Sequence, residues 1–89
     1  MSYAIEWRPL ARKQVRRLDL SARRRVLEAI DNLSREPRPV GSVTLAGSPG
    51  WRRIRIGSYR VVYEVQDDIL VVLVLRVGSR GDVYQHLDD

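Results

Sequence analysis

Apolar residues alternate with polar ones along much of the second half of the chain, which predicts three consecutive strands. They are expected at Trp51–Ile56, Tyr59–Gln66 and Ile69–Val77. Gly57-Ser58 joins the first two strands, and glycine at the first turn position fits a type II′ hairpin. Asp67-Asp68 is a weaker turn pair between the second and third strands. The third strand is apolar on both faces, as expected of a strand in the centre of a sheet.

The first half of the chain carries a helical pattern, with apolar residues at three- and four-residue spacing. A short opening strand of alternating residues, around Tyr3–Trp7, precedes it. A first helix is predicted over Pro9–Leu18, because proline is tolerated in the first turn. Ser21 is the expected N-cap of a second helix. That helix must end near Arg35-Glu36, since the prolines that follow cannot continue it. Two helices joined by so short a break pack most easily as an antiparallel hairpin.

The predicted elements follow the order β-α-α-β-β-β(-β), which defines an α+β fold. In this fold a helical hairpin packs on one face of a mainly antiparallel sheet. The loop Pro37–Gly50 separates the two halves, and Val43–Leu45 within it is expected to return to the core. The bracketed last strand is expected at Asp82–His86. With 89 residues and no internal repeat or linker, the chain is expected to form one domain over residues 1–89.

The charge of the chain favours an anionic partner, because the formal net charge is +5. Its placement is uneven, since residues 41–63 hold four basic residues and no acidic one. The absence of cysteine excludes disulfide and thiolate chemistry. The N-terminus lacks a signal peptide, and the longest apolar run, Ile69–Leu75, is far too short to cross a bilayer. We therefore expect a soluble cytoplasmic protein that does not act on a membrane.

The hairpin predicted over residues 51–63 presents its arginines on one surface. Side chains alternate between the two faces of a strand, so Arg53 and Arg55 share a face while Ile54 and Ile56 share the other. Arg60 of the next strand joins the arginine face. Guanidinium groups match phosphate oxygens in a bidentate fashion, so a polyanion is the first partner to consider.

The C-terminal segment contributes further candidates, Arg80 and Tyr84. If the strands form a meander, the end of the third strand lies beside the start of the second. Arg80, just past that end, would then come close to Arg60, and Tyr84 would fold across the same edge. The pattern therefore predicts that arginines from separate segments converge on one anion site.

These residues fall in strings that resemble the RelE/ParE superfamily of bacterial type II toxins, and the RelE-like branch in particular. The strings are L-x-x-x-P-R (Leu33–Arg38), L-x-G (Leu45–Gly47), R-I-R-x-G-x-Y-R-V-V-Y (Arg53–Tyr63) and V-G-x-R-x-x-V-Y (Val77–Tyr84). The last two, in this order, are the most specific, and the resemblance runs over nearly the whole chain. It implies a single RelE-like toxin domain that a cognate RelB-like antitoxin neutralises.

The resemblance also implies an activity. RelE-like toxins enter the ribosomal A site and cut the mRNA there, whereas ParE-like toxins of the same fold inhibit DNA gyrase without these catalytic groups. By position, Arg60 matches the arginine that contacts the scissile phosphate, and Arg80 matches the arginine assigned to phosphate stabilisation or leaving-group assistance. Tyr84 matches a tyrosine that stacks on or activates the nucleotide. Arg53 and Arg55 fall where well-studied members have lysines and are expected to bind RNA phosphate.

The residues alone leave several roles open. Arg60 could pair with Glu64 instead of phosphate, and Trp51 could pack at the rim of the core or stack on a base. The run Arg23–Arg25 is either a solvated helix face or a contact for RNA or an acidic antitoxin. A gyrase-inhibiting binder and a plain RNA-binding module are the alternatives to a nuclease.

The expected chemistry needs no metal and no other cofactor. With one histidine and no cysteine, the chain offers few ligands for a metal ion. Cleavage through the 2′-hydroxyl needs that group deprotonated, the phosphorane charge stabilised and the 5′-oxygen protonated. Arginines serve the second task, because preorganised cations stabilise developing charge. The proton could be taken by Tyr84, by His86 or with help from the ribosome, and the sequence does not choose among them.

Overall fold

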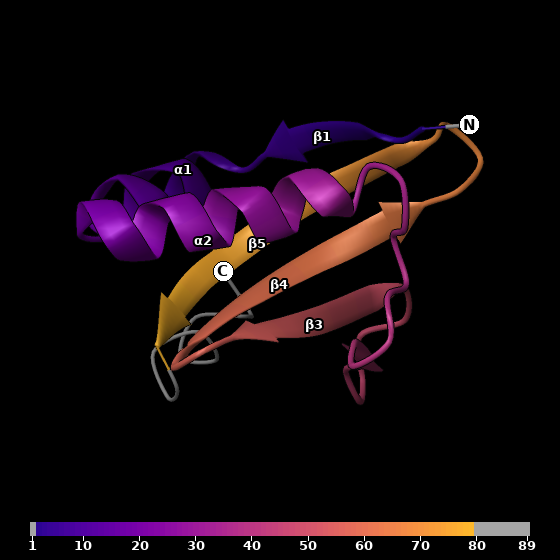
Figure 1. Cartoon of the computed structure of the whole chain (residues 1–89). Helices are drawn as coiled ribbons and strands as arrows, with labels where there is room; N and C mark the ends of the chain where they lie inside the picture. The colour runs from indigo at the N-terminus through magenta and orange to yellow at the C-terminus, as the bar shows by residue number, and fades with distance from the viewer. Residues whose placement is uncertain (1, 80–89) are drawn as a thin grey trace.

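Two helices cover one face of a five-stranded sheet whose strand order is β1-β5-β4-β3-β2 (Figure 1). The strands are β1 (Ala4–Trp7), β2 (Val43–Thr44), β3 (Trp51–Ile56), β4 (Tyr59–Gln66) and β5 (Val71–Ser79). The helices are α1 (Pro9–Arg16) and α2 (Leu20–Asn32). This computed structural model describes residues 2–79. The predicted α+β fold is confirmed.

The sheet is mixed but mainly antiparallel. β3, β4 and β5 form the predicted meander, β2 adds to the outer side of β3, and β1 pairs with β5 in parallel. β5 therefore lies in the interior of the sheet, as its apolar pattern predicted. The parallel pairing follows from the helices, which carry the chain from the end of β1 across one face before it returns to the sheet.

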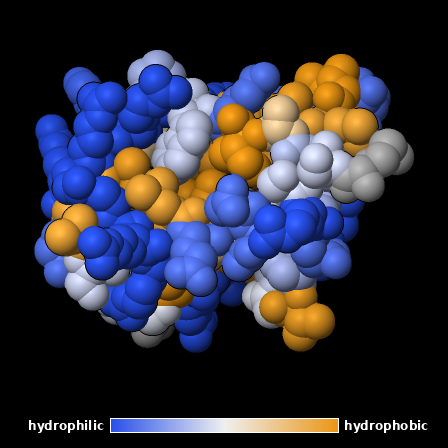
Figure 2. Space-filling model, turned by 45° about the horizontal axis from the view of Figure 1, so that its top comes forward, coloured by the Kyte–Doolittle hydropathy of each residue, from blue (hydrophilic) through white to orange (hydrophobic). Residues whose placement is uncertain are grey.

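The main core lies between the helices and the sheet. Val26 and Ile30 of α2 are buried together with Val61 and Tyr63 of β4. The apolar stripe of α2 thus packs against the apolar face of β4. Both elements could be predicted from the sequence because each buries one regularly spaced set of apolar residues. The outer surface on the helical side is largely hydrophilic, with scattered apolar patches (Figure 2). Neither helix described here is long and apolar enough to cross a membrane.

Both helices end earlier than predicted, and the predicted N-cap is wrong. α1 stops at Arg16 instead of Leu18. Asp19, not Ser21, caps α2, because its side chain accepts a hydrogen bond from the Ala22 amide at 3.3 Å. A carboxylate two residues upstream outcompetes the serine hydroxyl as acceptor for the first turn. α2 ends at Asn32, and turns carry the chain on to Glu36.

The strand boundaries agree with the prediction for β3 and β4 and differ for β5. β5 runs over Val71–Ser79 and not Ile69–Val77, because a longer turn holds Leu70 at a φ of 55°. The hairpin between β3 and β4 has positive φ at Gly57 (59°) and not at Ser58, as a type II′ turn requires. Val43–Leu45 does return to the sheet, as β2 and a core contact. The strand predicted at Asp82–His86 lies outside the described residues.

Two polar contacts fasten the loop that follows α2. The buried Tyr63 hydroxyl donates to the Pro37 carbonyl at 2.8 Å, and burial raises the pKa of this phenol. Arg38 forms a bidentate pair with Asp67, with N–O distances of 3.1 and 2.7 Å. Tyr3 donates to the same carboxylate at 2.6 Å. These contacts hold the beginning of the loop beside the β4–β5 turn and the N-terminal strand.

Candidate functional site

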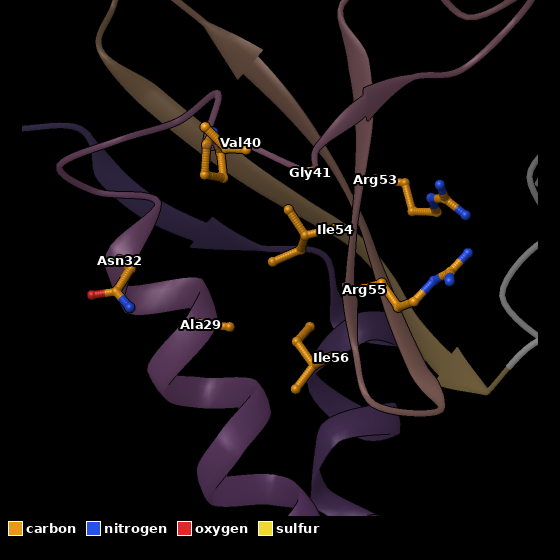
Figure 3. A pocket seen from close by; sticks show the side chains of 9 residues that line it. Ala29, Asn32, Val40, Gly41, Arg53, Ile54, Arg55 and Ile56 are labelled. Atoms are coloured by element: carbon orange, nitrogen blue, oxygen red, sulfur yellow. The ribbon is translucent and has the colours of Figure 1, made fainter.

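The face of the sheet away from the helices carries a cluster of arginines. Arg53 and Arg55 of β3 alternate with Ile54 and Ile56, which pack toward the helices. Figure 3 shows the two guanidiniums pointing away from these isoleucines. Arg60 of β4 alternates with core residues in the same way and pairs directly with Arg55. The predicted common face of these three arginines is confirmed.

Arg60 differs from its neighbours because it is buried, with only 7% of its surface exposed. Its Nε atom has no hydrogen-bond acceptor among residues 2–79. The same is true of the buried Nε of Arg53. The guanidinium keeps its charge in proteins, so a buried donor without an acceptor is costly unless a ligand supplies one. An anion bound on this face would satisfy both groups.

The alternative partner for Arg60, Glu64, is engaged elsewhere. Its Oε1 accepts a hydrogen bond from the Gln66 side chain at 2.8 Å. The single ion pair found within residues 2–79 joins Arg38 to Asp67, far along the chain from the cluster. Within residues 2–79, therefore, no ion pair joins Arg53, Arg55 or Arg60 to an acidic side chain.

A fourth arginine on this face, Arg76, was not predicted from the sequence. The β4–β5 register shifts between Val62 and Tyr63, which pair with Arg76 and Val74 and leave Leu75 as an extra residue. Such a bulge turns a side chain onto a different face. Leu75 packs with Val62 on the open face, and Arg76 lies next to it, 4% exposed. We call Arg53, Arg55, Arg60 and Arg76 the arginine face. Strand alternation alone could not reveal the bulge.

Arg52, the remaining arginine of β3, has a structural role on the opposite face. Its Nη2 donates to the Ser42 hydroxyl at 2.7 Å and its Nε to the same oxygen at 3.3 Å. These bonds hold the loop before β2 against the sheet. Successive residues of a strand point to opposite faces, so Arg52 stabilises the loop on one face while Arg53 and Arg55 lie on the other.

The surroundings of the arginine face are apolar at one end. Val62 and Leu75 form a small buried cluster against which Leu45, Trp51 and Leu73 pack. Trp51 therefore packs at the rim of this cluster. Of the helical run Arg23–Arg25, Arg23 donates to the Arg16 and Leu18 carbonyls at 2.7 and 3.1 Å and closes the end of α1. Arg24 and Arg25 are exposed.

Arg80 and Tyr84, together with His86, lie outside the described residues. The pairing that motivated their placement is present up to Ser79. Gly78 lies opposite Arg60 and Ser79 opposite Tyr59, so the end of β5 is beside the start of β4. Within residues 2–79 there is no group of three histidine, cysteine or acidic side chains that could hold a metal ion.

The fold and the arginine face define a small toxin of the RelE type, and comparison with known proteins gives the same class. The family model described as "ParE toxin of type II toxin-antitoxin system, parDE" matches residues 5–84. The chain is 34% identical to toxin RelG of Mycobacterium tuberculosis over 86 residues, covering 96% of this chain and 99% of RelG. It is 32% identical over 88 residues to the mRNA interferase toxin RelE of Escherichia coli K12, covering 94% and 92% of the two chains.

A solved structure agrees with the sequence relatives. The archaeal RelE–RelB complex from Pyrococcus horikoshii OT3 contains a chain that superposes with a TM-score of 0.80 at 31% identity, over 91% of this chain and 98% of that one. The protein belongs to the RelE/ParE family of type II toxins, and its curated relatives are RelE and RelG toxins over nearly their full length.

Proposed function

We propose that this toxin is a ribosome-dependent mRNA endoribonuclease, an mRNA interferase that stops translation by cutting message in the A site. The observation that carries the proposal is the buried Arg60 guanidinium, whose Nε lacks an acceptor while Arg55 faces it across the ladder. A scissile phosphate would supply both the hydrogen-bond acceptor and the negative charge that Arg60 lacks among residues 2–79. The relative named as an mRNA interferase supports the same activity.

The arginines act on the charge that develops during cleavage. Attack of the 2′-hydroxyl on phosphorus forms a dianionic phosphorane and then expels the 5′-oxygen. Arg60 and Arg80 stabilise this phosphorane, since fixed cations in a site with little water need no reorganisation during the reaction. Arg53 and Arg55 hold the flanking phosphates. No metal takes part in this scheme.

The proton transfers fall to the C-terminal segment or to the ribosome. Tyr84 acts at the nucleotide, by stacking or by accepting the 2′-hydroxyl proton with neighbouring guanidiniums favouring its anion. His86 is the other titratable group of the segment. Arginines at 53 and 55 are poor general bases, so a scheme based on lysine does not transfer to this chain. Ribosomal alignment of the RNA supplies part of the rate, because orientation alone can be worth several kcal/mol.

The partners of the toxin follow from the same proposal. A cognate RelB-like antitoxin neutralises it, as the crystallised RelE–RelB complex of the archaeal relative suggests. Its target is the cytoplasmic ribosome with mRNA in the A site. A second candidate function is inhibition of DNA gyrase, which the family model named for ParE favours. In that case the arginine face would only dock onto protein.

Expression of the toxin in cells separates the two functions. Primer extension on a reporter transcript should show cuts within translated codons soon after induction, with supercoiling of plasmid DNA unchanged. Intact message together with filamentous cells and altered supercoiling would instead identify a gyrase inhibitor. The double variant Arg60→Ala, Arg80→Ala serves as the control, and it should neither cut message nor arrest growth while still binding antitoxin.

A further inference from the structure

The open face of the sheet carries its side chains in rows that cross β3, β4 and β5. Two rows belong to the arginine face, and a third follows them along the strands. In order from the hairpin turn, the rows are Arg55 with Arg60 and Gly78, Arg53 with Val62 and Arg76, and Trp51 with Glu64 and Leu73. Residues two apart on a strand are separated by about 6.5–7 Å. Each step between rows therefore has about the length of one nucleotide step in an extended single strand.

The third row places a carboxylate, Glu64, on the same face as the arginines. Its neighbours in the row, Trp51 and Leu73, are apolar and partly buried. The Gln66 side chain donates to Oε1 at 2.8 Å, and this bond holds the carboxylate in place. Among the hydrogen bonds and ion pairs within residues 2–79, none reaches Oε2. The carboxylate thus offers an open acceptor beside apolar side chains, and a donor on a ligand would satisfy it.

The approach to this oxygen is free of a side chain on the loop that precedes β3. Gly50 lies beside it, since a methyl group added to Gly50 would be 3.9 Å from Oε2. Gly50 also has a φ of 85°, which favours glycine at this position. The carboxylate of Glu64 is therefore accessible to a group that comes from the direction of the loop.

An aromatic plane lies next to the carboxylate. Trp51 is directly opposite Glu64 in the β3–β4 ladder, and such neighbours have their Cβ atoms about 4.5–5.5 Å apart. The indole packs against the apolar cluster of Val62 and Leu75 and stays partly exposed. Stacking on an aromatic ring and a polar contact at the base edge are the two ways in which proteins bind unpaired bases. Trp51 and Glu64 provide one of each.

We propose that Trp51 and Glu64 form a subsite for one base of the RNA, next to the phosphate sites of the arginine face. The inference rests on the proposed function, which supplies single-stranded RNA as the ligand. With the scissile phosphate at Arg60, the next phosphate along the strand lies at Arg53, one row away. The base beyond that phosphate stacks on Trp51, and its exocyclic amine donates a hydrogen bond to Glu64.

The chemistry of the carboxylate determines which bases fit. An ionised carboxylate only accepts hydrogen bonds, so it selects a base by its donors. Glutamate commonly accepts from the amine of cytosine, and adenine and guanine carry an amine as well. Uracil has no amine, and the two carbonyl oxygens that flank its ring N–H repel a carboxylate. The subsite therefore disfavours uracil, whereas arginine contacts to phosphate carry no sequence information.

Binding of two pyrimidine strands of equal length and charge tests this selectivity. The probes are short oligocytidine and oligouridine, compared by fluorescence anisotropy at low salt, where phosphate contacts are strongest. The wild-type toxin should bind oligocytidine at least about fivefold more tightly than oligouridine. Glu64→Gln keeps the shape of the side chain but adds a donor that suits uracil, so the ratio should fall below about twofold.

The control for the lost charge is Glu28→Gln, at an exposed position of α2. It should retain the wild-type ratio, because it changes the net charge equally and lies on a helix that covers the opposite face. A wild-type toxin that binds the two strands alike would overturn the proposal. So would a ratio that Glu64→Gln leaves unchanged, or one that Glu28→Gln lowers as much.

Tryptophan emission tests the stacking directly. The chain has two tryptophans, and Trp7 packs against the core on the helical side of the sheet. Oligocytidine should therefore quench the emission of the wild-type toxin and leave that of Trp51→Phe nearly unchanged. Trp51→Phe keeps an aromatic ring and should bind within about threefold of wild type, whereas Trp51→Ala should bind at least about fivefold more weakly. Equal quenching of wild type and Trp51→Phe, or no quenching of either, would contradict the proposal.

These measurements do not depend on cleavage. A toxin that shows the base preference and the quenching but leaves message intact would retain this subsite and lose the nuclease assignment. A toxin that cuts message on the ribosome but binds the two strands alike would do the reverse.

Discussion

Arg55 and Arg60 lie directly opposite each other across the β3–β4 ladder, so two guanidiniums form one cross-strand pair. Like charges in this position destabilise a sheet by roughly 0.2–1 kcal/mol. The burial of Arg60 adds to this, because its Nε lacks an acceptor among the described residues. The sheet therefore holds an arrangement that weakens the free protein and that a bound phosphate would relieve.

Replacement of Arg60 by methionine should stabilise the free toxin. The unbranched apolar side chain fills the same buried space without a charge, so the free energy of unfolding should rise by about 1 kcal/mol. For a domain of this size that corresponds to an increase in Tm of roughly 4–8 °C. Thermal unfolding in a phosphate-free buffer measures the effect.

Inorganic phosphate provides the control for this variant. It should raise the Tm of the wild-type protein and leave that of Arg60→Met unchanged, since a ligand stabilises only the state that binds it. Arg24→Met, at an exposed helix position, should respond to phosphate like wild type. A loss of stability in Arg60→Met would show that Arg60 makes favourable contacts in the free protein, contrary to this account.

The three arginines of β3 should differ in how they affect RNA binding. With single-stranded RNA, Arg53→Gln and Arg55→Gln should each reduce the slope of log affinity against log salt by about 0.7, one phosphate contact each. Arg52→Gln should leave the slope unchanged, because Arg52 is bonded to Ser42 on the opposite face. Fluorescence anisotropy at several salt concentrations gives the slopes. If Arg52→Gln reduced the slope as much as the other two variants, RNA binding would depend on the net charge of the toxin and not on the arginine face.

Removal of the Tyr63 hydroxyl should destabilise the toxin. Tyr63→Phe leaves the Pro37 carbonyl without its donor in a buried position, at an expected loss of about 1–2 kcal/mol of unfolding free energy. Tyr59→Phe removes a hydroxyl from a partly buried tyrosine on the same strand and should change the stability by less than about 0.5 kcal/mol. Urea unfolding compares the two. Equal losses would show that the bond to Pro37 contributes nothing specific.

The Tyr3–Asp67–Arg38 contacts should make stability depend on acidic pH. The Arg38 guanidinium, and then the Tyr3 hydroxyl, lower the pKa of Asp67 from 3.8 to about 2. Because the folded pKa lies below the unfolded one, the contribution is complete above about pH 4 and is lost as the pH falls toward 2. Urea midpoints between pH 2 and pH 6 should fall less steeply for Asp67→Asn than for wild type. Asp68→Asn, at the exposed neighbouring position, should follow the wild-type curve, and a flattened curve there would contradict the assignment.

The sequence predicted the parts of the fold that depend on local periodicity. β3 and β4 were predicted to the residue, because the alternation of apolar and polar residues and the glycine turn agree over that stretch. The end of α2 and the start of β5 were misplaced, since a run of turns after Asn32 and the turn around Leu70 leave no periodic signal. The N-cap was misassigned between two residues of similar propensity, where only the geometry of the first turn decides.

Part of the candidate site could be predicted from the sequence and part could not. Strand parity was enough to place Arg53, Arg55 and Arg60 on one face. Strand alternation did not place Arg76 on this face, because the bulge at Leu75 shifts the side chains that follow it to the other face of the sheet. The sequence carries no signal for this bulge. The burial of Arg60 was also invisible in the sequence, since strand alternation gives the face on which a side chain lies and not its exposed fraction. The roles of Arg80 and Tyr84 remain predictions from the resemblance of their strings.

Cleavage by purified toxin on programmed ribosomes tests the central claim most directly. Under single-turnover conditions, with a defined codon in the A site, wild type and Arg52→Gln should cut the message at that codon. Arg60→Ala should cut at least about 100-fold more slowly, because it removes a preorganised cation from the phosphorane. Cleavage by Arg60→Ala at the wild-type rate, or message left intact by the wild-type toxin, would contradict the account.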